Sequence, residues 1–218
     1  MAIIHTSFVS VQDLAALCKE LLPGVAITNI VDDSLLPEVR EHGKLTHNVT
    51  RRICAYALEA QQMGCDAILN QCSSVGEAVD VARGLLNIPY LKVDEPMAEK
   101  AATIGGRIAV IATVPTTLGP SCRLVEQAAA RLGSKAEVVP VYVDGAFDVL
   151  IRQGSEAHNA MLLERVKQEA QQSACVVLAQ GSMLCLAPML TDLPVPVFTS
   201  PRLGVEQMRA VLQVGEAE

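Results

Sequence analysis

Cys72, in the run Gln71-Cys-Ser-Ser74, is the residue whose type and setting are best suited to chemistry. A short apolar run precedes it and a helical pattern follows it, so we expect it where a strand ends and a helix begins. Backbone amides and the dipole at such a position lower the pKa of a thiol, and they also suit a substrate carboxylate, as do Ser73 and Ser74. We therefore expect Cys72 to act as a base or nucleophile. The alternative is a small buried core residue.

A second polar run, Gln180-Gly181-Ser182, follows another apolar run. Gln180 stands 108 residues after Cys72. Its amide can donate or accept a hydrogen bond but cannot transfer a proton at neutral pH. Gln180 is thus either a substrate-binding group or a satisfied polar residue at a strand end. Cys185 follows on an expected helix and is a weaker candidate.

Polar residues also lie at or just after the ends of two other expected strands, and we include them as candidate substrate-binding groups. His5 could be an acid, a base or a buried hydrogen-bonding side chain, and Thr6 comes next. Thr113, Thr116 and Thr117 precede a helix expected to begin near residue 118, where threonines are either ordinary N-caps or ligand-binding groups.

Other polar and thiol groups favour structural roles. Asp32 and Asp33 favour a turn, and the run Asp94-Glu95-Pro96 most simply starts a helix. The seven cysteines are odd in number and contain no CxxC pair, which argues against a disulfide framework or a structural zinc site. Four of them fall in helix or strand patterns and are expected in the core: Cys18, Cys54, Cys65 and Cys175. No metal site and no cofactor is expected, because the chain lacks phosphate loops, metal-ligand spacings and a Ser-His-Asp arrangement.

Composition favours a soluble cytoplasmic protein that binds a small molecule. Half of the 218 residues are apolar, the net charge is −7 and aromatic residues make up 3%. The acidic balance and the lack of a basic run argue against nucleic acid as a partner. Apolar stretches are too short for a membrane span, and the N-terminus lacks the pattern of a signal peptide.

Short apolar runs alternate with longer helical patterns, which predicts parallel sheets covered on both faces. Strands are expected at 2–6, 25–31, 66–71, 90–93, 107–112, 136–143, 174–179 and 195–198. Helices are expected at 10–21, 46–63, 75–84, 95–103, 118–132, 156–172 and 203–213.

The sequence also repeats itself at a spacing of about 107 residues. Ile88-Pro89 recurs as Val195-Pro196, and the apolar run ending at Thr6 recurs as that ending at Thr113. We expect an α/β protein of two pseudo-symmetric, doubly wound domains, each with a parallel four-stranded sheet. The first lobe would comprise 1–97 plus 200–218 and carry Cys72, and the second, 98–199, would carry Gln180. Ligands bind at the carboxyl ends of such strands, so an active-site cleft is expected between the domains.

These features together resemble the aspartate/glutamate racemase superfamily, which includes hydantoin racemase, maleate isomerase and arylmalonate decarboxylase. The resemblance covers essentially the whole chain and rests on the duplicated halves, on Cys72-Ser-Ser74 in place of the family's Cys-Asn-Thr, and on Ile111-Ala-Thr-Val-Pro-Thr-Thr117. It implies cofactor-independent chemistry by two cysteines on opposite faces of a carbon next to a carboxylate. The second family motif, Gly-Cys-Thr, falls on Ala179-Gln180-Gly181. Gln180 therefore replaces the second cysteine.

Three interpretations remain open on the sequence alone. The first is a racemase, epimerase or isomerase of a small amino acid or hydantoin-like acid, with Cys72 as general base or acid and a second group such as Cys185 or His5. The second is a single-cysteine decarboxylase or lyase of the arylmalonate decarboxylase type. The third is a non-catalytic protein that binds a small acid. The resemblance also implies that the protein can form a homodimer.

Overall fold

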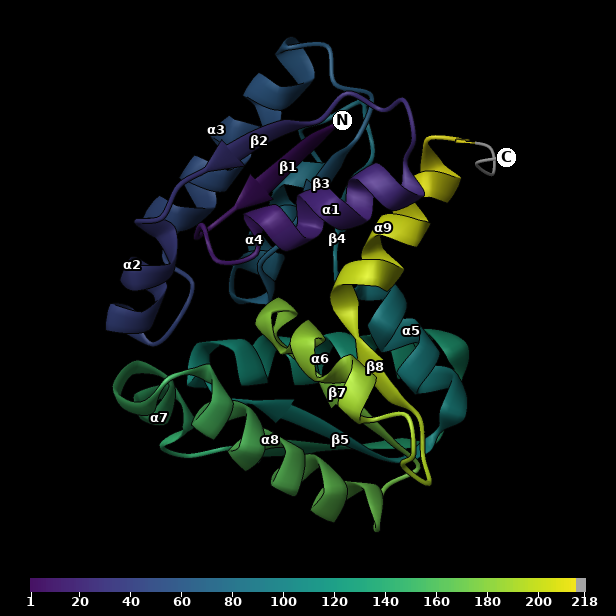
Figure 1. Ribbon diagram of the computed structural model, residues 1–218. Coiled ribbons are helices and arrows are strands. Elements are labelled where there is room, and N and C mark those ends of the chain that lie inside the picture. Colours follow the sequence, from purple (N-terminus) through teal and green to yellow (C-terminus); the bar gives the residue numbers. More distant parts are fainter. Residues whose placement is uncertain (215–218) are drawn as a thin grey trace. The chain divides into compact units, whose positions relative to one another are not determined.

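The computed structural model describes residues 1–214, and it divides the chain into two compact units (Figure 1). The first unit contains Met1–Pro96 together with the chain from Pro201 onward, and the second contains Met97–Ser200. Each unit is built around one all-parallel sheet, as the sequence predicts.

In the first unit the strand order is β2-β1-β3-β4. The strands are β1 (Ala2–His5), β2 (Thr28–Val31), β3 (Ile68–Asn70) and β4 (Tyr90–Lys92). The helices are α1 (Val11–Leu21), α2 (Leu35–His42), α3 (His47–Gln62), the 3₁₀ helix η1 (Ser73–Val75), α4 (Gly76–Arg83) and α9 (Ser200–Val211). Ala2, Ile4 and Ile68 pack with α3 and α4 in one buried cluster. Residues alternate between the two faces of a strand, so Ile3 and His5 lie on the other face.

The second unit repeats this topology with the order β6-β5-β7-β8. Its strands are β5 (Gly106–Ala112), β6 (Ala136–Tyr142), β7 (Cys175–Leu178) and β8 (Val197–Thr199). Its helices are α5 (Glu95–Ile104), which crosses the boundary between the units, α6 (Pro115–Leu132), α7 (Ala146–Gln153), α8 (Ser155–Ala170) and the 3₁₀ helix η2 (Gly181–Met189). The matching strand orders confirm two doubly wound α/β halves.

Three local expectations were wrong. Helix α6 begins at Pro115 rather than near residue 118, because proline at the first helical position has the required φ and no amide hydrogen to satisfy. Helices α2 and α7 were not predicted, and each is only eight residues long. In addition, α2 contains Pro37, and proline usually indicates the end of a helix. In the first turn, however, proline is compatible with a helix. Cys65 lies in the turn after α3, not in the helix.

Gly204 lets α9 lie directly against the end of β4. A Cβ added at Gly204 would stand 2.6 Å from the carbonyl oxygen of Val93 and 2.9 Å from its Cα. Alanine is intrinsically the better helix former by about 1 kcal/mol. The clash of the added Cβ with the backbone of Val93 should outweigh that gain, because inserting extra atoms into a packed structure costs free energy.

We expect Gly204→Ala to lower the free energy of unfolding by about 1–3 kcal/mol, measured by urea denaturation. Gly84→Ala is the matched control, because its added Cβ would meet only the carbonyl oxygen of Val81 at an ordinary 3.6 Å. Equal stability of Gly204→Ala and the wild type would contradict the close approach.

Glu169 of α8 anchors the start of β5. Its side chain is 4% exposed and lies 2.9 Å from Arg107 and 2.9 Å from Arg165. Burial raises its pKa, but the hydrogen bonds and positive charges of the two arginines outweigh burial, so the pKa lies below the usual value of 4.5. A depressed carboxyl pKa stabilises the fold above the unfolded-state pKa, and that stability is lost as the pH falls through the folded-state pKa.

We therefore expect Glu169→Gln to lower the free energy of unfolding at pH 7 by about 1–3 kcal/mol. The difference from the wild type should shrink as the pH falls from 4.5 through the lower folded-state pKa, because the folded wild type then becomes neutral at this position as well. Denaturant titrations from pH 7 to pH 3 measure the difference in the free energy of unfolding. A difference that does not change with pH would show that the stabilisation does not come from the carboxylate charge.

Candidate active site

The first unit carries a row of polar side chains just beyond the carboxyl ends of three strands. In the sheet, Ile4 pairs with Asn70 and Asn70 pairs with Lys92. Two residues further along each chain stand Thr6, Cys72 and Asp94. An even step in a strand returns a side chain to the same face, so these three lie in one row on one face. Ligands of open parallel sheets bind at this edge.

Cys72 is the N-cap residue of η1 and has an extended backbone (φ −116°, ψ 116°). The side-chain amide of Asn70 donates to the Cys72 carbonyl oxygen at 2.8 Å and so fixes the backbone. The thiol receives hydrogen bonds from the hydroxyl of Thr6 and from the backbone amide and hydroxyl of Ser74. The structure thus brings Thr6 and Ser74 to Cys72.

The expectation of a lowered thiol pKa was wrong, although the backbone amide of Ser74 does act in the lowering direction. Burial raises the pKa of Cys72 above its usual value of 9.0, and the hydrogen bonds from Thr6 and Ser74 only partly oppose it. The negative charge of Asp94 raises it further. The helix at this point is a single 3₁₀ turn, whose dipole is small, so loss of hydration dominates. In the free protein the Cys72 thiol is therefore protonated at neutral pH.

Asp94 was read from the sequence only as the start of a helix, and its place beside Cys72 was missed. It directly precedes α5, it is 3% exposed, and its carboxylate accepts a hydrogen bond from Ser73. Burial is the largest influence on its pKa and raises it above 3.8. The signal was available in the strand spacing, because Asp94 follows its strand at the same distance as Cys72 follows β3.

His5 lies on the opposite face of β1 from Thr6. It is fully buried, and its Nε2 lies 3.0 Å from the Oδ1 of Asn29 on β2. Burial lowers the pKa of the imidazole, and the hydrogen bond with Asn29 does not compensate, so His5 is neutral at pH 7. Among residues 1–214 no hydrogen bond joins His5 and Cys72.

In the second unit, Gln180 occupies the position that Cys72 has in the first. It is the N-cap of η2, with a closely similar backbone (φ −124°, ψ 132°). Its Oε1 accepts from the backbone amide of Thr113 at 2.6 Å and from the Thr113 hydroxyl at 3.0 Å. The pair Thr113–Gln180 thus repeats the pair Thr6–Cys72 of the first unit.

These hydrogen bonds fix which end of the Gln180 amide faces Thr113. A backbone N–H can only donate, so the group facing it is the carbonyl oxygen. The NH₂ group with its two donors therefore points elsewhere, and the side chain of Gln180 forms no other hydrogen bond within the described part of the chain. The NH₂ group of Gln180 is thus left as a hydrogen-bond donor without a partner in the described chain.

The remaining candidates of this unit lie at the first turns of α6 and η2. Thr116 and Thr117 fall inside α6 rather than before it, and the N-cap is Val114, so the N-cap interpretation of these threonines was wrong. The hydroxyl of Thr116 is buried without a hydrogen-bond partner among residues 1–214. Gly181 opens η2, and Ser182 is exposed on it.

Of the other cysteines, Cys185 alone is hydrogen-bonded to one of these groups among the described residues. Cys18 and Cys175 are buried, and Cys54 and Cys65 are partly buried against the core of the first unit. Cys185 is exposed on η2, with its sulfur 3.3 Å from the carbonyl oxygen of Ser182. Across the described residues, no group of three or more His, Cys, Asp or Glu side chains could hold a metal ion.

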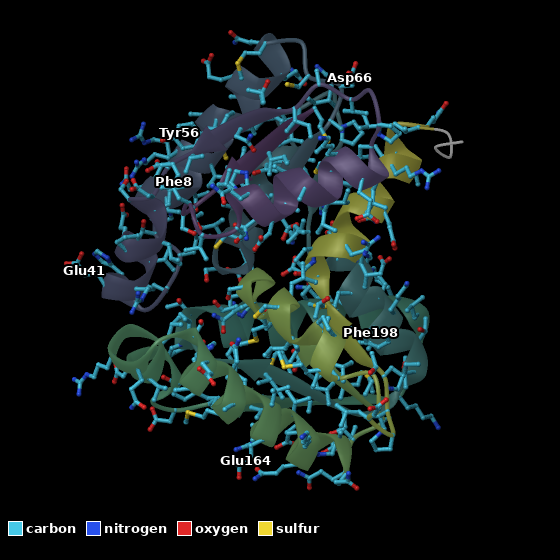
Figure 2. All side chains as sticks on the ribbon, viewed as in Figure 1. Phe8, Glu41, Tyr56, Asp66, Glu164 and Phe198 are labelled. Carbon is cyan, nitrogen blue, oxygen red and sulfur yellow. The ribbon has the colours of Figure 1, made fainter. Side chains whose placement is uncertain are left out.

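The carboxylate of Asp32, just after β2, has structural partners. Asp32 accepts from the backbone amide of Ser34 at 3.2 Å and from the hydroxyl of Tyr56 at 2.5 Å (Tyr56 is labelled in Figure 2). The guanidinium of Arg52 forms an ion pair with the same carboxylate. Asp32 therefore closes the turn before α2, as the sequence favours.

The family model for Asp/Glu/hydantoin racemases matches residues 4–208. The chain belongs to this family. No curated protein matches it at the level of sequence. In the described chain, no helix is both long and apolar enough to cross a membrane.

Solved racemase structures share the fold of this family member. Allantoin racemase from Klebsiella pneumoniae is 18% identical, with a TM-score of 0.69 over 99% of this chain and 88% of that chain. Glutamate racemase from Francisella tularensis, in complex with D-glutamate, is 13% identical, with a TM-score of 0.75 over 97% of this chain and 80% of that chain. An aspartate racemase homologue from Pyrococcus horikoshii, PH1733, is 13% identical, with a TM-score of 0.67 over 97% of this chain and 98% of that chain. At these identities the likeness shows the fold alone.

Proposed function

We propose that the protein is a cofactor-independent racemase or epimerase acting at the carbon next to the carboxylate of a small acid, such as an amino acid or a hydantoin-like compound. Cys72 is the general base and acid of this reaction. The observation that carries the proposal is the Cys72 thiol beyond the end of β3, hydrogen-bonded by Thr6 and Ser74. Membership of the racemase family supports the reaction class.

We propose that the substrate binds beyond the carboxyl ends of the strands, beside Cys72. The carboxylate would be held by amides and hydroxyls that follow the strands, because such groups donate to anions without carrying charge. These groups are Ser73, Ser74, Thr113, Thr116, Thr117, Gly181 and Ser182.

The proposed chemistry moves one proton. The Cys72 thiol first loses its proton to water. The resulting thiolate takes the proton from the α-carbon and becomes a thiol again, and the electron pair left on carbon spreads into the adjacent carboxylate as an enolate. Hydrogen-bond donors directed at the enolate oxygen stabilise this negative charge. Inversion then requires an acid on the face opposite Cys72. Gln180 cannot fill that role, and His5 is buried on the other face of β1, so Cys185 is the thiol left for it.

The fixed orientation of Gln180 favours a second candidate, a single-cysteine lyase of the arylmalonate decarboxylase type. The Oε1 of Gln180 is occupied by Thr113, so its NH₂ group would hold a carboxylate or enolate oxygen. In this reaction the bond from the α-carbon to one carboxylate breaks, CO₂ leaves, and Cys72 protonates the resulting enolate from one face. The product would be a single enantiomer.

Proton NMR in D₂O with pools of enantiopure 2-substituted carboxylic acids and malonates tests the proposal. Loss of the α-proton signal with loss of optical purity is the expected result and assigns a racemase. Loss of CO₂, or one-sided deuterium incorporation with optical purity retained, assigns the lyase instead. No change in any pool, together with ligand binding by calorimetry, would overturn both and leave a protein that only binds small acids.

A further inference from the structure

Asp94 is a buried carboxylate that has no part in the proposed proton transfer. It stands in the same row as Cys72, one strand away, and adjacent parallel strands lie about 4.8 Å apart. Ser73, the next residue after Cys72, donates its hydroxyl hydrogen bond to Asp94. Two residues after the end of β8 the sequence has Pro201 rather than a carboxylate, so the second strand set does not repeat Asp94.

The charged neighbours of Asp94 are already engaged with other partners. The ammonium of Lys92 on β4 lies 2.7 Å from the carboxylate of Asp80 on α4. Glu95 of α5 lies 2.7 Å from Arg83, which also comes from α4. Asp94 forms no ion pair within residues 1–214, and Cys72 is the titratable group that faces it from β3. The row therefore holds a thiol and an unpaired carboxyl side by side.

We propose that Asp94 is a positioning residue that keeps the Cys72 thiol protonated in the free enzyme, so that the two groups together carry one negative charge and not two. Two like charges at adjacent strand ends, one of them on a buried side chain, repel, and one of the two sites keeps its proton. The thiol, unlike a thiolate, is a poor target for oxidation and alkylation. Asp94 thus protects Cys72 while the site is empty.

The directions of the two pKa values agree with this arrangement. Burial raises the pKa of the Cys72 thiol, and the charge of Asp94 raises it again. Burial likewise raises the pKa of Asp94, while the hydrogen bond from Ser73 and the charge of Lys92 lower it and the charge of Glu95 raises it. The carboxyl has the lower ordinary pKa, so it takes the single negative charge first.

Alkylation by iodoacetamide tests the proposal without any substrate, with each cysteine followed by peptide mass spectrometry across a pH series. The variant Asp94→Asn removes the charge but can still accept from Ser73 and cap α5. We expect its Cys72 to react roughly tenfold faster than the wild type at neutral pH, because more of it is thiolate. Asp94→Glu keeps the charge and should react like the wild type.

The buried thiols Cys18, Cys122 and Cys175 serve as the internal control, because their labelling would report unfolding rather than ionisation. Should Asp94→Asn expose them, Asp94→Ser is a smaller neutral N-cap that gives the same comparison. An unchanged or slower rate at Cys72 with these thiols unlabelled would overturn the proposal. The inference rests on the proposed function for its meaning, but the two can fail separately. An active Cys72→Ala variant sinks the proposed function and leaves the alkylation result untouched.

Discussion

Replacing Cys72 by serine is expected to lower kcat/KM by about 10³-fold or more, because a serine hydroxyl at this position cannot become the base that removes an α-proton. Serine is nearly the same size as cysteine and can still accept the hydrogen bonds of Thr6 and Ser74. The fold should therefore be retained, with a melting temperature close to that of the wild type. Steady-state kinetics and thermal denaturation measure the two effects.

Cys65→Ser is the matched control for this variant. Cys65 is partly buried like Cys72, but it precedes β3, whereas Cys72 follows it. Asp66, its neighbour, is labelled in Figure 2. Equal losses of activity in both variants would mean that substitution of a thiol damages the protein in general, and full activity of Cys72→Ser would contradict its assignment.

The second large effect is expected at Gln180. Gln180→Glu keeps an oxygen for the Thr113 amide, so the local fold should survive, but it replaces the NH₂ donor by a second oxygen. A negative charge then faces the substrate carboxylate or enolate. We expect a loss of about 10²–10³-fold in kcat/KM, comparable to removal of one oxyanion donor.

Gln180→Leu completes the comparison, because it removes the donor and also leaves the buried Thr113 amide without its acceptor. It should lose activity like the glutamate variant and lose stability as well, by about 1–3 kcal/mol. Wild-type kinetics in Gln180→Glu would contradict the role of the amide as a donor. A gain in racemisation would point to a need for a second acid at this position.

The arrangement of strands could be predicted from the sequence because their signal is strong and local. Continuous apolar runs such as Ile108–Ala112 fit strands buried on both faces, and the repeat spacing indicated two like halves. Short helices were missed, because eight residues with a proline, as in α2, carry little periodic signal. The start of α6 was missed because Pro115 was not read as its first residue.

The strand-end placement of the candidate residues was predictable, but their electrostatics were less so. The strand-end positions of Cys72 and Gln180 follow from the repeat alone. The pKa of Cys72 does not, because it depends on how much water the packed neighbours exclude, and this outweighed the helix-end amides. Asp94 was missed because its sequence neighbours, Glu95 and Pro96, signal a helix start. The contact with Ser73 needs the pairing of β3 with β4.

The most direct test of the central claim is exchange of the α-proton into D₂O by proton NMR, comparing the wild type with Cys72→Ala at equal concentrations of folded protein. The account predicts rapid exchange of the best substrate by the wild type and a rate indistinguishable from buffer with Cys72→Ala. Wild-type exchange by Cys72→Ala would show that another group removes the proton, and the assignment of Cys72 as the base would be wrong.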